Sequence, residues 1–252
     1  DNSCVLEAEG RTFPVDGEYY FRGQGAVKGN PWGKGFSGPD DDEDDNRRDA
    51  SGKGDSGLIE EARDAILDLE SRHRDHLLCF LPTERDIQDL ANELKPDLDA
   101  ASFDILPLYG RMSPDEQRRI FRSTSKTRVV LATNIAETSL TVPDISTVID
   151  SGLARINRFE PRTGMNRLVT ESECEFSAAQ RAGRAGRTQK GRCIRMWHKT
   201  DLRLKSLPVE ILRSDITFLV LECALWGALR RDSIDWLDLP PLGAWNQACE
   251  FL

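Results

Sequence analysis

The sequence predicts an α/β protein in which a mainly parallel sheet is flanked by helices. Between residues 58 and 197, short runs of apolar and β-branched residues alternate with longer segments whose apolar residues recur at helical spacing. This alternation favours a parallel sheet, because a helix is the usual connection between parallel neighbours. The 252 residues are enough for one large domain or two modest ones, and the chain has no internal repeat.

Local patterns predict the individual elements. Apolar residues from Leu58 onward fall on one helical stripe. A later helix has a recognisable start, since Ser113 is a suitable N-cap, Pro114 fits the first turn and Glu116 stands three residues after the cap. The predicted strands are 76–81, 104–108, 128–132, 145–149 and 192–197, and the predicted helices between them are 83–95 and 113–121.

Two flanking regions differ from this core. Residues 5–20 indicate an opening pair of strands, whereas residues 21–57 are rich in Gly and Asp with few aliphatic side chains. Such a segment buries too little apolar surface to offset its ordering entropy, so we expect a disordered insertion in a surface loop. A new helical pattern covers 208–226. The expected parts are leading strands at 1–20, the insertion at 21–57, the α/β domain at 58–203 and a further helical region at 204–252.

The composition excludes several classes of protein. No apolar stretch approaches the length that spans a bilayer, and the amino terminus has no signal-like segment. The six cysteines are scattered without a CxxC pair, and the three histidines form no metal pattern with them. We therefore expect a cytoplasmic protein with reduced thiols, without a membrane partner and without a structural metal ion.

The net charge of −9 is distributed unevenly along the chain. Residues 40–49 hold seven acids and two arginines, whereas residues 180–200 hold seven Lys or Arg and no acid. Affinity for nucleic acid follows the local patch more than the total charge. The overall negative charge therefore does not exclude a nucleic-acid partner.

The most informative segment is QRAGRAGR at 180–187, in which an arginine recurs at every third residue. On a helix of about 3.6 residues per turn, Arg181, Arg184 and Arg187 would gather on one side, and the small residues between them would leave that side open. The planar guanidinium stays charged and binds phosphate oxygens through two donors. The pattern therefore favours a phosphate site over the alternative, a solvated basic face.

A second polar segment, LATNIAETSLT at 131–141, follows the predicted strand 128–132. Polar loops at the ends of buried strands are where α/β proteins place ligand contacts. By composition alone, an ordinary turn explains this segment equally well.

Together the two segments resemble motifs V and VI of superfamily 2 helicases. The sequence ATNIAETSLT followed by QRAGRAGR resembles the corresponding motifs of DEAH-box RNA helicases of the bacterial Hrp type. The resemblance covers about residues 75–252 and includes HLLCFLP at 76–82. It also includes a turn at 159–164, which resembles the β-hairpin that DEAH enzymes insert between motifs V and VI.

The resemblance implies a second RecA-like domain at 58–203, with 1–20 as its leading strands, followed by the truncated start of a winged-helix domain at 204–252. The sequence contains neither a GxxxxGK[ST] phosphate loop nor a DEAH tetrad. Family enzymes carry these motifs on a first RecA-like domain, which binds ATP and Mg²⁺. The implied partners are therefore that domain of the same protein and RNA, either single-stranded or a duplex with an overhang.

The function implied is the C-terminal half of an ATP-dependent RNA helicase, which hydrolyses NTP to move along and unwind RNA, and which is inactive as this fragment alone. Two alternatives stay open from the residues. The chain could be a non-catalytic module that binds nucleic acid or regulates another protein, or it could be half of a DNA helicase.

The resemblance also implies the catalytic roles. Arg184 and Arg187 are expected to be the arginine fingers that stabilise charge on the γ-phosphoryl group, and Gln180 is expected to orient the attacking water or a phosphate oxygen. Arg181 is expected to be structural rather than catalytic.

The remaining implied site residues fall into two sets. The nucleotide set is Ser139, Thr141, Asp144 and Phe121, and the nucleic-acid set is Thr133, Asn134, Thr138, Tyr109 and Gly110. Many DEAH members carry a ribose-binding acid where this chain has Pro143, so the ribose contact assigned to Asp144 departs from the family pattern. For Phe121, packing into the core is the alternative to contact with adenine.

Overall fold

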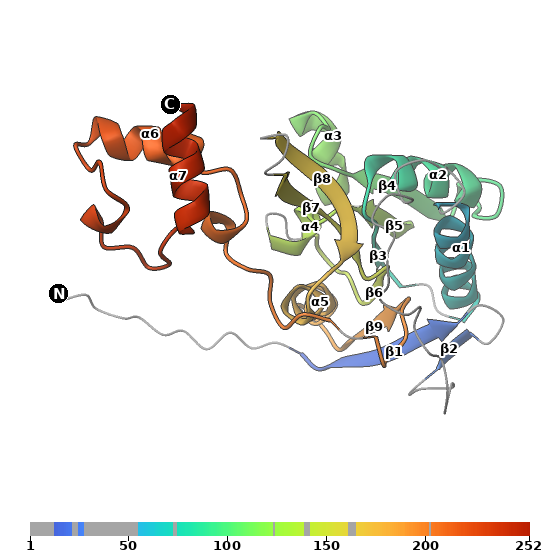
Figure 1. The fold of residues 1–252 in the computed structure, drawn as a ribbon. Helices are drawn as coiled ribbons and strands as arrows, with labels where there is room; N and C mark the ends of the chain where they lie inside the picture. The colour runs from blue at the N-terminus through green and yellow to red at the C-terminus, as the bar shows by residue number, and fades with distance from the viewer. Residues whose placement is uncertain are drawn as a thin grey trace.

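A seven-stranded sheet forms the centre of the molecule, with the strand order β2-β1-β9-β6-β3-β5-β4 (Figure 1). All neighbouring strands are parallel except β1 and β2, which are antiparallel. This computed structural model describes residues 13–21, 25–27, 55–72, 75–122, 124–138, 142–160, 165–201 and 203–252. The prediction of a mainly parallel α/β fold is therefore confirmed.

The strands β3, β4, β5, β6 and β9 match the predicted positions to within a few residues. The central strand β3 pairs with β5 on one side and with β6 on the other, so that Leu77 stands opposite both Val129 and Thr147. The strands are β1 Val15–Phe21, β2 Gly25–Val27, β3 Leu77–Phe80, β4 Phe103–Leu108, β5 Thr127–Ala132, β6 Thr147–Asp150 and β9 Gly191–Arg195.

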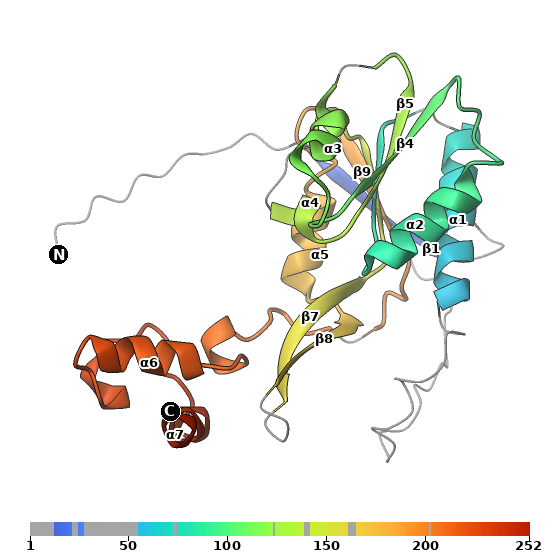
Figure 2. The same ribbon diagram turned by 90° about the horizontal axis from the view of Figure 1, so that it is seen from above.

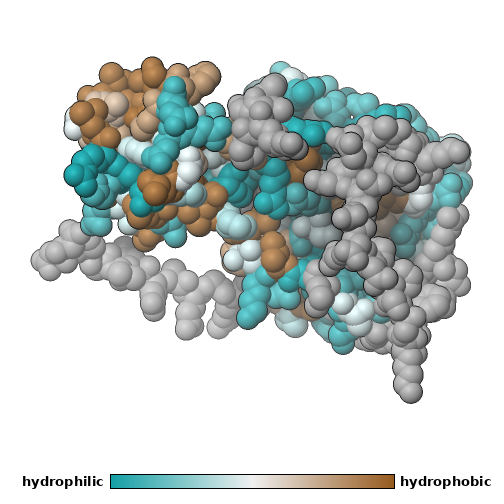
Figure 3. All heavy atoms as spheres, viewed as in Figure 1, coloured by the Kyte–Doolittle hydropathy of each residue, from teal (hydrophilic) through white to brown (hydrophobic). Residues whose placement is uncertain are grey.

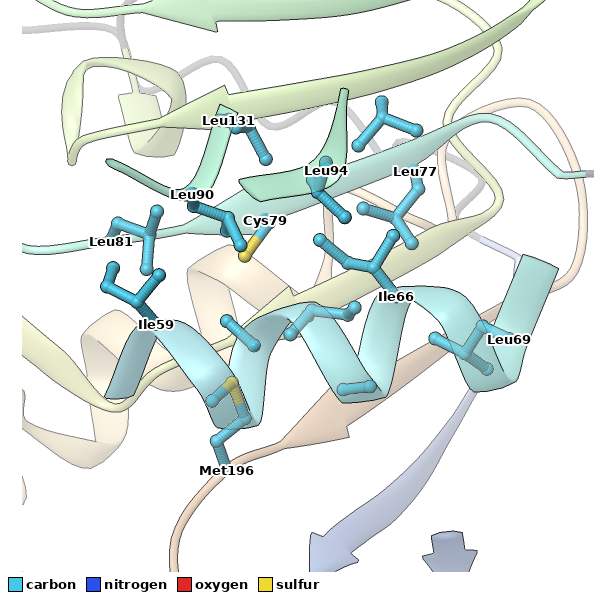
Figure 4. Close-up of a cluster of buried hydrophobic side chains, with 14 of the residues drawn as sticks. Ile59, Ile66, Leu69, Leu77, Cys79, Leu81, Leu90, Leu94, Leu131 and Met196 are labelled. Carbon is cyan, nitrogen blue, oxygen red and sulfur yellow. The ribbon is translucent and has the colours of Figure 1, made fainter. Parts of the chain in front are cut away.

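Helices cover both faces of the sheet (Figure 2). One face carries α1 (Asp55–Arg72) and α2 (Glu84–Leu94), and the cluster beneath them is drawn in Figure 4. The other face carries α3 Pro114–Arg118, the 3₁₀ turn η1 Arg119–Phe121, α4 Ile135–Thr138 and α5 Glu175–Ala182. Along β5, Val129 packs on the first face and Val130 on the second, as the two-residue period of a strand requires.

Two helix starts show how local sequence fixes these positions. The hydroxyl of Ser113 accepts from the Glu116 backbone N–H while the Glu116 carboxylate accepts from the Ser113 N–H, which is the predicted capping box. Thr83 and Asp86 form the same reciprocal pair at the start of α2. These pairs satisfy backbone donors that the first turn would otherwise leave without partners.

A β-hairpin and a small helical unit lie outside the main sheet. Strands β7 (Leu153–Glu160) and β8 (Met165–Ser172) pair in antiparallel fashion, as expected for a hairpin between motifs V and VI. Beyond them lie η2 Glu210–Leu212, α6 Thr217–Leu225, η3 Arg231–Ser233 and α7 Leu242–Phe251. The helices α6 and α7 enclose their own apolar cluster around Trp245. Figure 3 shows further apolar side chains gathered on the surface of this unit.

Two predictions about segment boundaries are wrong in part. The predicted helix over 208–226 becomes an α-helix only at Thr217, and before it the Asp215 carboxylate accepts from both the backbone N–H and the hydroxyl of Thr217 in a local turn. Part of the predicted insertion at 21–57 is also ordered, since Gly25–Val27 pairs with β1 and α1 begins at Asp55. Residues 28–54, and residues 5–12 of the opening strand pair predicted over 5–20, lie outside the described residues.

In the part of the chain that the structure describes, no helix has the length and apolar character needed to cross a membrane. The assignment of 204–252 to a winged-helix domain stays a prediction.

Candidate nucleotide and nucleic-acid site

Arg181 is the buried centre of the site. The residue is only 1% exposed, and its guanidinium stacks on the Phe80 ring, 4.9 Å from the ring centroid. Its Nη1 donates to Asp150 Oδ1 at 2.9 Å and to the Leu153 carbonyl at 3.1 Å. Its Nε lies 3.1 Å from an oxygen of Glu137 and 2.8 Å from one of Glu173. Arg181 therefore ties α5 to β6, α4 and the base of the hairpin, as a structural residue would.

Two of these carboxyl groups, those of Asp150 and Glu173, are fully buried beside Arg181. Burial, followed by the negative charge of Asp150, raises the pKa of Glu173 to about 9. Asp150 Oδ2 and Glu173 Oε1 are both buried, and neither has a hydrogen-bond partner among the described residues. Burial and the neighbouring Asp150 therefore favour the protonated form of Glu173 at neutral pH.

The other two arginines do not lie on a helix, contrary to the prediction. Helix α5 ends at Ala182, and the backbone N–H of Arg184 donates to the Arg181 carbonyl at 3.0 Å in a tighter 3₁₀-type turn. The chain must turn here to reach β9. Gly186 makes this possible, because a Cβ on it would come within 2.6 Å of the Phe13 carbonyl oxygen. We call residues 183–187 the arginine turn.

Within the arginine turn, Arg184 and Arg187 lie close enough to repel each other. Burial, and then the positive charge of Arg187, lower the pKa of Arg184, while attraction to Glu137 opposes that shift. The Arg184 residue is 6% exposed, whereas Arg187 is exposed. A guanidinium keeps its charge at neutral pH even when its pKa is lowered, so the turn concentrates two positive charges.

The predicted nucleotide residues precede strands. Phe121 ends η1 on the way to β5, and Asp144 lies in the turn before β6 with a positive φ of 62°, which Asp adopts more readily than most residues. Phe121 is 42% exposed while its neighbour Ile120 is 1% exposed, so the alternative of a core-facing Phe121 is wrong. Ser139 and Thr141 lie outside the described residues.

The predicted nucleic-acid residues instead follow strands. Tyr109 and Gly110 come directly after β4, and Thr133 and Asn134 come directly after β5. The Thr133 N–H donates to the Leu108 carbonyl at 3.1 Å, which brings the two segments together. A Cβ on Gly110 would meet no atom within 4 Å, so its backbone is open to a ligand. Thr138 ends α4, but its side chain is outside the described part.

The predicted site residues therefore fall into two groups, which lie at opposite ends of the strands. In a parallel sheet, segments that follow strands lie at the carboxyl edge and segments that precede strands lie at the amino edge. The nucleic-acid residues lie at the first edge, and Phe121, Asp144 and the end of the arginine turn lie toward the second. Gln180 is half-buried in the last turn of α5, directly before Arg181 in the sequence.

Sequence reasoning missed the three acids around Arg181. Glu137 lies inside the motif ATNIAETSLT, and its placement four residues after Thr133 was the available signal. Asp150 and Glu173 gave no local signal beyond their position at strand ends, because their role depends on elements that only the fold brings together.

Comparison with known proteins agrees with this architecture. A mainly parallel sheet with helices on both faces and an antiparallel hairpin defines an α/β domain of the RecA-like class. Residues 59–189 match the family described as helicase conserved C-terminal domain, and the chain belongs to that family, among the Hrp-type C-terminal helicase domains.

Individual relatives are similar over most of the chain. The ATP-dependent RNA helicase HrpA of Escherichia coli (strain K12) is 38% identical over 229 residues, which is 90% of this chain but 16% of that protein. HrpB of the same organism is 40% identical over 173 residues, which is 66% of this chain and 21% of that protein. The crystal structure of Escherichia coli DEAH/RHA helicase HrpB has a TM-score of 0.76 at 32% identity, and the match covers 96% of this chain and 28% of that chain.

The two glycines of the arginine turn should tolerate alanine differently. In Gly186→Ala the new Cβ would meet the Phe13 carbonyl oxygen at 2.6 Å and Val15 Cγ2 at 2.7 Å, so the free energy of unfolding should fall by about 1–3 kcal/mol. Gly183→Ala is the matched control, because its Cβ meets only helix carbonyl oxygens at 3.4 Å. Urea unfolding followed by tryptophan fluorescence measures both, and equal losses would contradict the packing described here.

The raised pKa of Glu173 predicts how the unfolding free energy of Glu173→Gln depends on pH. In the unfolded chain Glu173 ionises near the ordinary glutamate pKa of 4.5, but the folded protein holds the proton to about pH 9. Folding therefore binds a proton between these values, and the wild-type protein loses stability as the pH rises through this window. Gln cannot ionise and can still donate to Asp150. Relative to wild type, the variant should gain up to about 1.4 kcal/mol of unfolding free energy per pH unit.

The measurement is the unfolding free energy at several pH values between about 6 and 8, the middle of that window. Glu175→Gln is the control, since Glu175 lies on the same helix α5 and is exposed. A Glu173→Gln protein whose stability depends on pH as steeply as the wild type would show that the proton is absent.

Proposed function

We propose that this chain is the second RecA-like half of an ATP-dependent RNA helicase, in which Arg184 and Arg187 act on ATP and the carboxyl edge of the sheet holds the RNA backbone. The observation that carries the proposal is the arginine turn, in which Arg184 and the exposed Arg187 follow directly after Arg181, which buried ion pairs anchor. Relatives named ATP-dependent RNA helicases support the reaction.

The chemistry of the arginine turn fits phosphoryl transfer. Negative charge gathers on the γ-phosphoryl oxygens as the bond to the leaving group breaks, and a fixed guanidinium lowers the barrier by several kcal/mol. Arg187 is exposed and can reach a nucleotide held by another domain, while Arg184 is positioned by its burial. Gln180, in the last turn of α5, is assigned to orient the attacking water.

Because the chain carries no phosphate loop, we assign most of the contacts to ATP and Mg²⁺ to a first RecA-like domain of the same protein. Bound Mg²⁺ would neutralise phosphate charge there. From this chain, we assign Phe121, which is exposed, to adenine, and Asp144 with Ser139 and Thr141 to the ribose and phosphate side.

The carboxyl edge offers contacts that suit a sugar–phosphate backbone. Hydroxyl and amide groups at Thr133, Asn134 and Thr138, with the open backbone at Gly110, can meet phosphate and sugar oxygens without reading bases. We assign Tyr109, the neighbour of Gly110 in the sequence, to the same contact with the nucleic-acid backbone. Closure of two RecA-like domains on ATP, followed by release after hydrolysis, would then move the RNA between them.

The catalytic half of the proposal predicts that Arg187→Gln reduces kcat for ATP at least about a hundredfold, because one finger charge is lost from the transition state. The assay combines this chain with a cognate first RecA-like domain and measures ATP hydrolysis with and without RNA. Unfolding should be unchanged, since Arg187 is exposed.

Arg85→Gln is the control for charge, since Arg85 lies on α2 on the opposite face of the sheet and its side chain is 78% exposed. Normal ATP turnover by Arg187→Gln would reject the assignment and favour a non-catalytic module.

The nucleic-acid half predicts that Gly110→Ala weakens RNA binding without loss of stability. The new methyl group meets nothing in the protein, so only a close ligand would be obstructed. Gly57→Ala on α1 is the matched control, with an equally open Cβ position on the other face. Fluorescence anisotropy with labelled RNA and DNA strands at several salt concentrations measures the effect, and tighter binding of DNA than of RNA would favour the DNA helicase alternative.

A further inference from the structure

Glu137 lies between the two groups of residues in the proposed function. It belongs to α4, a single helical turn that starts from the nucleic-acid segment. The Ala136 N–H donates to the Thr133 carbonyl at 3.2 Å, and the Glu137 N–H donates to the Asn134 carbonyl at 2.9 Å. A shift of Thr133 or Asn134 therefore shifts the Glu137 backbone as well.

On the other side, the Glu137 carboxylate reaches the arginines. Its Oε2 lies 3.1 Å from Arg181 Nε, and α4 and α5 lie side by side on the same face of the sheet (Figure 2). Of the three acids around Arg181, Glu137 is the most accessible, with a side chain that is 16% exposed against 0% for Asp150 and 1% for Glu173. Asp150 and Glu173 are enclosed in the interior, whereas Glu137 is partly accessible to solvent.

The same carboxylate also acts on Arg184. Its attraction opposes the effects of burial and of Arg187 on the Arg184 guanidinium. The backbone provides a second link, because the Arg184 N–H donates to the Arg181 carbonyl at 3.0 Å. The charge of Glu137 thus bears on the residue assigned as a finger, both directly and through Arg181.

We infer that Glu137 is a positioning residue that transmits RNA binding at α4 to Arg184 and so couples RNA to ATP hydrolysis. This inference rests on the proposed function. RNA held by Thr133 and Asn134 would fix α4, and Glu137 would then hold Arg181 and draw Arg184 into the orientation used for hydrolysis. Without RNA, α4 would occupy that position less often, because an effector changes a rate only through the state that it binds better.

The test is Glu137→Gln in the assembly of this chain with a cognate first RecA-like domain. Gln keeps the size of the side chain and removes its charge. The ratio of kcat at saturating RNA to kcat without RNA should fall about tenfold, within the usual range of coupling between two sites. The KM for ATP and the Kd for RNA should stay within about twofold, because neither ligand loses a contact of its own.

Two variants control this measurement. Glu175→Gln makes the same charge change at an exposed position of α5 and should leave the ratio unchanged. Glu137→Asp keeps the charge on a shorter side chain and should restore at least half of the lost stimulation. It also serves as the second variant if Glu137→Gln does not fold, in which case its own ratio should lie below that of the wild type.

The outcomes separate this inference from the function on which it rests. A stimulation ratio reduced by less than about threefold overturns the inference, and so does a proportional fall in both rates, which would indicate a purely structural ion pair. Equal behaviour of Glu137→Asp and Glu137→Gln overturns it as well. If the assembly hydrolyses no ATP, or if Arg187→Gln hydrolyses it normally, the proposed function itself fails.

Discussion

The buried ion-pair network of Arg181 is the interaction on which the candidate site depends. One guanidinium, 1% exposed, joins β6, α4, the end of α5 and the base of the hairpin through Asp150, Glu137, Glu173 and the Leu153 carbonyl. Burying an arginine costs several kcal/mol unless its donors are satisfied, and removing one partner leaves an uncompensated charge. The network therefore fixes where α5 ends and where the arginine turn begins.

The same network gives three arginines of one repeat different roles. Arg181 is enclosed by acids, Arg184 is buried but repelled by its neighbour, and Arg187 is exposed. This gradient arises because the helix ends after Arg181 and the chain then tightens toward β9. A continuous helix would have presented three equivalent charges to solvent. The end of α5 instead anchors Arg181 in the interior, and the arginine turn gives Arg184 and Arg187 different degrees of exposure.

Glu137 extends the network toward the carboxyl edge of the sheet. Its backbone is bonded to the segment assigned to RNA, and its carboxylate acts on Arg181 and Arg184. The two edges of the sheet are far apart along each strand, so a link between them must pass across a face. Helices α4 and α5 provide that path, because the residues that follow β5 and those that precede β9 meet there.

The sequence by itself determined the parallel α/β architecture, the capping box at Ser113 and the two motifs that indicate the family, because periodicity, cap chemistry and motif wording are local properties. It did not determine that α5 stops at Ala182, that Gly25–Val27 extends the sheet, or that Phe121 faces solvent. Nor did it show that Glu137, Asp150 and Glu173 converge on Arg181. The convergence on Arg181 depends on contacts such as that with Glu137, 44 positions away, which form only when the chain folds. Burial and charge neutralisation at such contacts are properties of the folded chain, and no window of sequence contains them.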